Sequence, residues 1–227
     1  MQLPNGATVI FDLDGTLIDT APDLLLTLNT VLGDEGRDWI DAPHMRPLVG
    51  RGARILIAEG LRFTGEPGDE KTIDRLLDKF LDIYAKNIDH LSRPFDGVVQ
   101  VLDWLAANDV KMGVCTNKRE ALSVDLLTKL NMIKYFPMVL GADSLAVRKP
   151  NPVHLTQTIA RLGGSEPHAV MVGDSITDVK TAKAAGIPVI VVDFGYTDIP
   201  PADLGGEALV SHFREMPAAI ERLLTPA

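Results

Sequence analysis

Residues 7–16 read ATVIFDLDGT and are the most informative segment of the chain about its fold. Its first half, Ala7 to Phe11, is apolar and rich in β-branched residues, which is typical of a strand buried on both faces. Its second half carries two carboxylates, Asp12 and Asp14, two positions apart and directly after that strand. Two carboxylates this close repel each other unless a cation or a proton lies between them. The stretch therefore predicts a buried strand that ends in a charged site.

A block of helical signals follows this strand. Leucines recur at helical spacing over residues 21–32, and residues 55–61 and 72–88 are also amphipathic. Almost no strand signal occurs between residues 20 and 92. We therefore predict an all-helical insertion over residues 19–93.

From residue 94 onward, strand and helix signals alternate. The predicted strands are residues 110–115, 137–140, 169–172 and 188–192, and the predicted helices are residues 98–108, 120–130, 153–162 and 176–185. Strands that alternate with helices of this kind are typical of βαβ units and a parallel sheet. The predicted fold class is α/β, with a Rossmann-like core formed by residues 1–18 and 94–227 and the helical block inserted after its first strand.

The charge balance excludes several classes of partner. The 227 residues contain 22 Lys and Arg against 31 Asp and Glu, a formal net charge of -9. A nucleic acid or an anionic membrane surface would require a basic face, so we expect neither. The single cysteine excludes an internal disulfide framework and indicates a reducing compartment. With no signal peptide and no apolar run of about 18 residues, we expect a cytoplasmic protein.

Polar residues follow four of the predicted strands. They are Asp12, Asp14, Thr16, Thr116, Asn117, Lys149, Gly173, Asp174, Ser175 and Asp178. Taken alone, a single cluster has a plain structural explanation, because Asp174 or Ser175 could simply cap the following helix. The four clusters together favour a shared functional site, because the carboxyl ends of parallel strands meet at one edge of the sheet.

This set of groups suits phosphoryl transfer through a carboxylate nucleophile. A carboxylate that approaches a phosphate dianion to about 4 Å meets a repulsion of about 8 kcal/mol at an effective dielectric near 20. A divalent cation and a lysine ammonium reverse that sign, and Mg²⁺ is the cation that suits oxygen ligands beside phosphate. A second aspartate can then act as general acid and later as general base.

The four clusters, in this order, resemble the motifs of the haloacid dehalogenase superfamily, in its Mg²⁺-dependent phosphatase branch. The resemblance covers residues 11–196. It implies that Asp12 is the nucleophile, which becomes an aspartyl phosphate and also binds Mg²⁺. It implies that Asp14 is the acid/base, with its backbone carbonyl as a further Mg²⁺ ligand, and that Asp174 completes the metal site.

The same resemblance implies roles for the remaining motif residues. Thr116, with help from Asn117, would hydrogen-bond the transferring phosphoryl group, and Thr16 belongs to the same phosphate-binding set. Lys149 would neutralise nucleophile and phosphate. Asp178 would orient Lys149 or the water shell of the metal, with Gly173 and Ser175 in support.

The helical block resembles the cap of this superfamily, which closes over the site and selects the substrate. Residues 20–24, 49–54, 184–186 and 194–196 resemble phosphoglycolate phosphatases most closely. The implied reaction is hydrolysis of 2-phosphoglycolate to glycolate and phosphate. Other capped phosphatases, acting on a sugar phosphate, a nucleotide or pyrophosphate, and a hexose-phosphate mutase remain alternatives.

Arg51 and Arg54 in the helical block are candidates for pairing with a substrate carboxylate. The planar guanidinium group fits a carboxylate with two parallel hydrogen bonds. The alternative is that both residues are exposed and solvated at a helix start.

A phospho-accepting signalling module, such as a receiver domain, is the alternative from another functional class. Receiver domains are doubly wound and use acidic Mg²⁺ ligands and a lysine. They are about half this length, however, and have no helical insertion. The expected partner is therefore a small phosphorylated metabolite, and both a monomer and a homodimer stay open.

Overall fold

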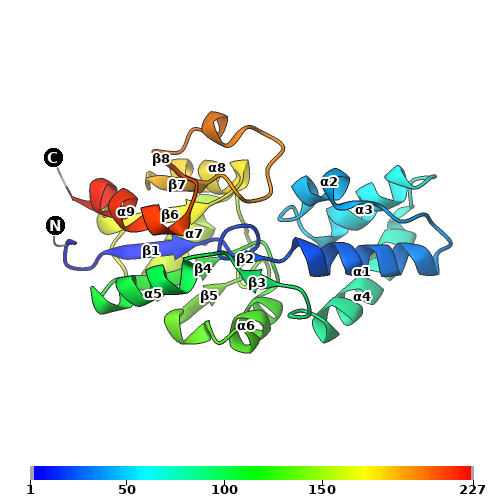
Figure 1. Cartoon of the computed structure of the whole chain (residues 1–227), viewed down its shortest axis with the longest axis horizontal. Coiled ribbons are helices and arrows are strands. Elements are labelled where there is room, and N and C mark those ends of the chain that lie inside the picture. The colour runs from blue at the N-terminus through cyan, green and yellow to red at the C-terminus, as the bar shows by residue number, and fades with distance from the viewer. Residues whose placement is uncertain (1–2, 226–227) are drawn as a thin grey trace.

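The chain folds into two parts that lie end to end along the long axis of the molecule (Figure 1). The computed structural model describes residues 3–225. One part holds a parallel sheet covered by helices, and the other is a group of helices. The strands are β1 Thr8–Phe11, β2 Ile18–Asp19, β3 Arg93–Pro94, β4 Lys111–Cys115, β5 Met138–Leu140, β6 Ala169–Gly173, β7 Val189–Val192 and β8 Ala208–Val210. The α-helices are α1 Ala21–Asp34, α2 Ala42–Met45, α3 Ala53–Phe63, α4 Glu70–Lys86, α5 Val98–Ala107, α6 Glu120–Lys129, α7 Pro152–Arg161, α8 Ile176–Ala185 and α9 Met216–Leu224.

The main sheet has the strand order β5-β4-β1-β6-β7-β8. All of its strand pairs are parallel. The chain places β4 and β5 on one side of β1 and then crosses to place β6 on the other side. In open α/β sheets, a ligand crevice forms where the strand order reverses in this way. A site is therefore expected at the carboxyl end of β1.

Strand β1 is fully buried because helices cover both faces of the sheet. Val9 and Phe11 belong to the apolar cluster that includes residues of α5 and α9. Ile10 belongs instead to the cluster that includes residues of α7 and α8. A strand with two covered faces requires a mostly apolar run, which explains the composition of residues 7–11. The polar Thr8 is buried there with its hydroxyl donating to the Gly6 carbonyl at 2.9 Å.

The helical part is held together by its own apolar contacts. Helix α4 packs against α1 and α3 through one apolar stripe. The buried residues of this stripe are Ile73, Leu76, Phe80 and Tyr84. Their spacing of three and four residues puts them on one face of the helix, which is why the sequence pattern folds as an amphipathic helix here.

Two chain crossings connect the sheet part with the helical part, and they lie side by side. Strand β2 pairs antiparallel with β3, so Asp19 lies opposite Arg93. The crossings enter and leave the helical part close to the carboxyl end of β1 (Figure 1). The division into a core of residues 1–18 and 94–227 and a cap of residues 19–93 falls at this ribbon and stays a prediction.

The predicted α/β fold class, with a helical insertion after the first strand, is confirmed. Helix 176–185 has the predicted bounds, and the other predicted helices and strands of the sheet part differ by no more than one residue at either end. Strand β8 and helix α9 had no predicted counterpart. The three residues of β8 are too few to show a period, and they form a strand only by pairing with β7. Within residues 3–225, none of the helices combines the length and the apolarity that crossing a bilayer requires.

Candidate active site

The carboxyl ends of the central strands bring the predicted motif residues to one buried place. Asp12 follows β1 directly, Thr116 follows β4, and Asp174 follows β6. Strand β1 lies between β4 and β6, so Asp12 has a motif residue on either side. All three side chains are buried, although two of them carry a carboxyl group.

A buried lysine links two of the aspartates. Lys149 Nζ lies 2.8 Å from Asp12 Oδ1 and 2.7 Å from Asp178 Oδ1. Burial opposes the charge on Lys149, but the two carboxylates together raise the pKa of its ammonium group. Lys149 is therefore a permanent cation beside Asp12 at neutral pH. The predicted grouping of Lys149 with Asp12 and Asp178 is present in the structure.

The start of α8 holds Asp178 in place. The backbone N–H and the hydroxyl of Ser175 both donate to Asp178 Oδ2, at 3.1 and 2.7 Å. A side chain at Gly173 would collide with the Asp178 carboxylate, so glycine is required there. Both oxygens of Asp178 thus have donors, which suits a residue that positions Lys149.

Asp174 is held by contacts from two other loops. The backbone N–H of Tyr196 donates to Asp174 Oδ2 at 2.6 Å, and the Thr16 hydroxyl donates to Oδ1 at 3.3 Å. Gly15 has a φ of +82°, and a Cβ there would meet both Asp174 and Tyr196. The turn after β1 therefore needs glycine both for its backbone conformation and for space. In the structure, Thr16 contacts Asp174, a partner that the sequence did not indicate.

Asp14 lies in a different environment from Asp12. Its Oδ1 accepts a hydrogen bond from the Thr20 hydroxyl at 2.7 Å. Lys118 Nζ lies 3.1 and 3.3 Å from the two carboxylate oxygens of Asp14. The same ammonium donates to the Tyr84 hydroxyl of α4 at 2.8 Å. The two aspartates of the first motif therefore have separate cations.

Lys118 and Tyr84 were missed by reasoning from the sequence. Lys118 directly follows Thr116 and Asn117, so its place after a strand was an available signal. Tyr84 gave no such signal, because it reads as one more apolar residue of an amphipathic helix. Only the packing of α4 over the sheet edge brings its hydroxyl to Lys118.

The two predicted phosphate-binding residues after β4 contact backbone groups of the protein. The Thr116 hydroxyl is buried and accepts the backbone N–H of Lys118 at 3.2 Å. The Asn117 amide donates to the backbone carbonyl of Lys149 at 3.1 Å, so it ties two motif loops together. Their predicted contact with a phosphoryl group stays a prediction.

Arg51 and Arg54 line the cavity described below, but both have acidic partners. Arg51 donates to Asp198 at 2.9 Å, and Arg54 donates to Glu70 and Asp74. Their side chains are 45% and 42% exposed. Their predicted contact with substrate stays a prediction.

The acidic residues form a cluster that could hold a metal ion. Carboxylate oxygens of Asp12, Asp174 and Asp178 all lie within 4.8 Å of one another. Burial raises the pKa of Asp12 to about 6 although Lys149 opposes the shift. Burial, reinforced by Asp178 and Asp12, raises the pKa of Asp174 well above its usual range.

The residues present fit a hard divalent cation. Four carboxyl groups, of Asp12, Asp14, Asp174 and Asp178, face two ammonium groups, so a divalent cation would balance the two negative charges that remain when all four are ionised. The buried Asp12 Oδ1 has the Lys149 ammonium as its partner at 2.8 Å. Oxygen-only donors with an excess of negative charge are the ligand set that Mg²⁺ prefers.

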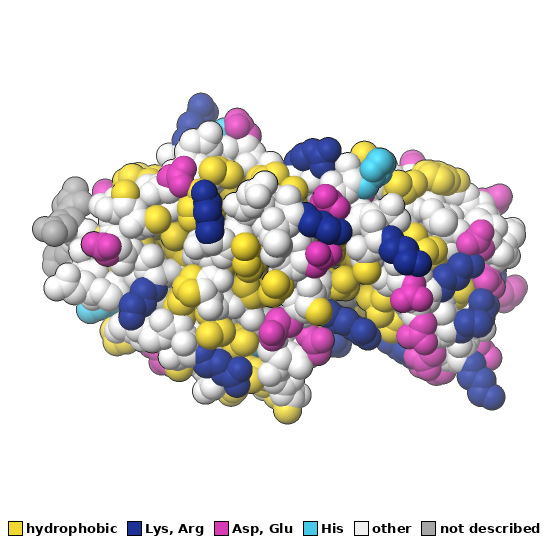
Figure 2. Space-filling view, turned by 90° about the horizontal axis from the view of Figure 1, so that it is seen from below, with side chains coloured by type: hydrophobic (Ala, Val, Ile, Leu, Met, Phe, Trp, Pro, Cys, Tyr) yellow, Lys and Arg dark blue, Asp and Glu magenta, His cyan; other side chains and the backbone are white. Residues whose placement is uncertain are grey.

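A cavity opens beside Asp14, between the helical part and the sheet part. Its volume is about 330 Å³, and its lining includes Asp14, Arg51, Tyr84, Lys118 and Arg148. This volume is at the small end of the range for ligand sites. Figure 2 shows that the molecule narrows between the two parts and that Lys and Arg side chains lie in this hollow.

Comparisons with known proteins agree with this architecture. The family model of the haloacid dehalogenase-like hydrolases matches residues 9–192. The chain is 42% identical to the phosphoglycolate phosphatase of Caulobacter vibrioides over 221 residues, covering 97% of this chain and 93% of that protein. It is 44% identical to that of Mesorhizobium japonicum over 220 residues, covering 96% and 97%. A crystal structure from Haemophilus somnus, described as a predicted phosphoglycolate phosphatase, has a TM-score of 0.88 and 27% identity, covering 94% and 97%.

A buried histidine supports the lysine loop. His154, near the start of α7, is fully buried, and its Nδ1 accepts the backbone N–H of Lys149 at 3.2 Å. Burial, reinforced by the charge of Lys149, lowers the pKa of His154 from 6.5 to about 4. The imidazole is therefore neutral at pH 7 and available as an acceptor.

The low pKa of His154 predicts a stability loss on acidification. Its folded-state pKa lies below the unfolded value, so the unfolded chain binds the extra proton as the pH falls through 6.5. Stability that is present above pH 6.5 is therefore lost progressively toward pH 4, by about 3 kcal/mol from this residue. His154→Asn keeps an acceptor without a titrating ring and should remove this component. Urea unfolding of both proteins at pH 7 and pH 4 measures it, and an equal pH dependence in the two would contradict the assignment.

Proposed function

The chain belongs to the haloacid dehalogenase-like hydrolase family, and on that premise we propose that it is a Mg²⁺-dependent phosphatase whose substrate is 2-phosphoglycolate. The relatives that bear the name phosphoglycolate phosphatase are similar over almost the whole chain, which supports the substrate. Membership of a hydrolase family also favours turnover over a phospho-accepting signalling module.

One observation carries the mechanism: Asp12 and Asp14 have different partners. Asp12 lies against Lys149 in a buried acidic cluster, which suits a nucleophile that must meet a phosphate. Asp14 lies at the cavity wall, held by Thr20 and Lys118, which suits a group that meets the leaving oxygen. Two carboxylates with separate environments can take separate roles in one reaction.

In the proposed first step, a carboxylate oxygen of Asp12 attacks phosphorus. A bond forms between this oxygen and phosphorus, and the bond from phosphorus to the ester oxygen breaks. Asp14 gives a proton to the departing ester oxygen, so the alcohol leaves neutral. Lys149 offsets negative charge on Asp12 and on the transferring group, while Thr116 donates to that group.

In the second step, water hydrolyses the aspartyl phosphate. Asp14, now a carboxylate, takes a proton from the water as the water oxygen bonds to phosphorus. The bond between phosphorus and Asp12 breaks, which returns the nucleophile and releases inorganic phosphate.

We assign the metal site to Asp12 and Asp174, with the backbone carbonyl of Asp14 as a further ligand. When bound, Mg²⁺ supplies the positive charge that lets an anionic nucleophile meet an anionic phosphate. Asp178 contributes through Lys149, because both of its oxygens already accept hydrogen bonds from protein donors.

Replacing the nucleophile tests the chemistry. Asp12→Asn keeps the shape and removes the nucleophilic charge, so phosphate release should fall by about 10³-fold or more. The control is Asp203→Asn, an exposed carboxylate of the sheet part that should leave the rate unchanged. A colorimetric phosphate assay measures both, and substantial activity in Asp12→Asn would exclude the mechanism.

Metal binding is tested apart from turnover. Saturating Mg²⁺ should raise the melting temperature of the wild-type protein by about 5 °C, since a ligand that binds only the folded state stabilises it. Asp174→Asn should lose this rise, and Asp203→Asn should keep it. EDTA should abolish phosphate release; a Mg²⁺-induced rise in Asp174→Asn equal to that of wild type would refute the ligand assignment.

A substrate panel tests the specificity. With Mg²⁺ present, kcat/KM for 2-phosphoglycolate should exceed the values for glucose 6-phosphate, a nucleoside monophosphate and pyrophosphate by about tenfold or more, equal to about 1.4 kcal/mol. A higher kcat/KM for one of the other compounds would identify that compound as the better substrate and would leave the proposed mechanism unchanged. Conversion of glucose 1-phosphate to glucose 6-phosphate would instead identify a mutase.

A further inference from the structure

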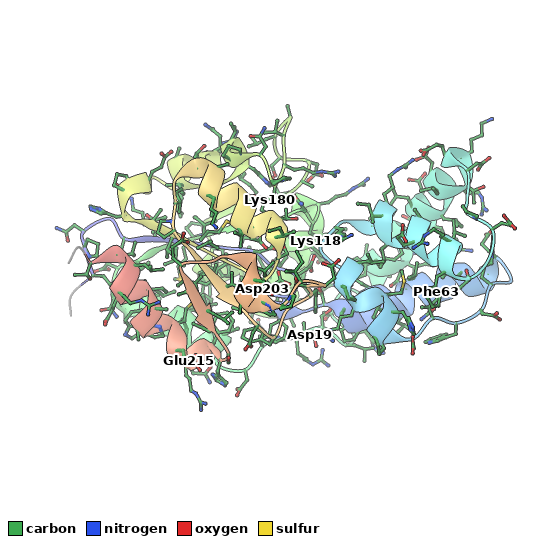
Figure 3. All side chains as sticks on the ribbon, turned by 90° about the horizontal axis from the view of Figure 1, so that it is seen from above. Asp19, Phe63, Lys118, Lys180, Asp203 and Glu215 are labelled. Carbon is green, nitrogen blue, oxygen red and sulfur yellow. The ribbon has the colours of Figure 1, made fainter. Side chains whose placement is uncertain are left out.

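Lys118 is a buried cation at the wall of the cavity, and none of the motif roles accounts for it. We propose that Lys118 binds a second anionic group of the substrate, a carboxylate close to the phosphate ester, and thereby sets the specificity of the enzyme. This inference rests on the proposed phosphatase function. Figure 3 shows Lys118 between the sheet part and the helical part, at the hollow where the two meet.

Distance from the acid/base puts Lys118 in reach of such a group. Asp14 would give its proton to the ester oxygen, so the atoms bonded to that oxygen come to lie beside Asp14. Lys118 Nζ lies 3.1 Å from the Asp14 carboxylate. In 2-phosphoglycolate the carboxylate carbon is only two bonds from the ester oxygen, which brings the carboxylate to this side of the cavity.

The burial of Lys118 distinguishes it from the other cations that line the cavity. Its side chain is 5% exposed, against 45% for Arg51 and 42% for Arg54. Arg119 and Arg148 are also exposed. Among the described lining residues, Lys118 is thus the cation that water screens least, so a carboxylate gains most from meeting it.

The ammonium of Lys118 has contacts to two side chains. Its Nζ lies 3.1 and 3.3 Å from the two Asp14 oxygens and donates to the Tyr84 hydroxyl at 2.8 Å. A lysine ammonium carries three N–H donors. If one N–H is shared between the two oxygens of Asp14, or if the longer of these two contacts is given up, one N–H can meet a substrate carboxylate while Lys118 still contacts Asp14.

Tyr84 also holds the ammonium in place. Its hydroxyl accepts from Lys118 Nζ at 2.8 Å, and the ammonium lies 4.4 Å from the centre of its ring. Because Tyr84 belongs to α4, the helical part contributes directly to the position of the charge. A charge held by partners on two elements loses little freedom when it binds a ligand.

The test compares two phosphate esters that differ only where Lys118 should act. Ethyl phosphate has the same ester oxygen and first carbon as 2-phosphoglycolate but a methyl group in place of the carboxylate. For Lys118→Met, the ratio of kcat/KM for 2-phosphoglycolate to that for ethyl phosphate should fall by about 10- to 100-fold, the effect of losing a hydrogen bond to a charged group. Lys118→Arg should recover part of the ratio because it restores the charge.

A matched control and a binding measurement separate recognition from a structural role. Lys86→Met removes an exposed lysine of α4 and should keep the wild-type ratio. The inhibition constant of glycolate, the carboxylate product, should rise about tenfold or more in Lys118→Met, whereas that of inorganic phosphate should stay within a factor of three. If Lys118→Met does not fold, Lys118→Gln replaces it, with the same expectations.

The outcomes separate this inference from the proposed function. If both esters slow equally in Lys118→Met and the ratio stays at the wild-type value, Lys118 acts only through Asp14 and the inference is overturned. A wild-type enzyme that releases no phosphate from 2-phosphoglycolate overturns the proposed substrate as well, and this result appears before any variant is made. A fall in kcat/KM that is larger for 2-phosphoglycolate than for ethyl phosphate in Lys118→Met supports both the proposed function and the role of Lys118.

Discussion

The repulsion between buried carboxylates governs how the site and the segments around it are built. Three carboxylates with oxygens within 4.8 Å of one another meet at the end of a strand that is buried on both faces. Water cannot screen them there, so each needs a fixed partner. Lys149 supplies the central positive charge, and Ser175, Thr16 and the backbone of Tyr196 supply fixed donors. The negative charge that Lys149 does not balance would suit a bound divalent cation.

The same constraint links the helical part to the site. Asp14 has one partner, Thr20, at the entrance to the helical part, and another, Lys118, that is itself bound to Tyr84 of α4. Movement of α4 would therefore alter the surroundings of Asp14 as well as the shape of the cavity. In this way a helical block that contributes none of the four motifs still borders the proposed chemistry.

Most of the sheet part and its motif residues could be predicted, because their signals are local. The apolar run at residues 7–11, the alternation after residue 94 and the polar residues after each strand are visible in the chain itself. Tyr84 could not be predicted as a site residue, since its spacing is that of a core residue of α4 and its partner is 34 positions away. Strand β8 was not predicted for a related reason. Its three residues form a strand only because they pair with β7.

Which chemical groups are available follows from the amino-acid sequence alone. It set the order of carboxylates, lysine and hydroxyl groups, and parallel strands bring such groups to one sheet edge regardless of loop details. The tertiary structure decided which cation serves which aspartate: Lys149 lies beside Asp12, and Lys118 lies beside Asp14. The physical reason is that burial and charge pairing depend on distances of a few ångströms between segments far apart in the chain, and only packing fixes those distances.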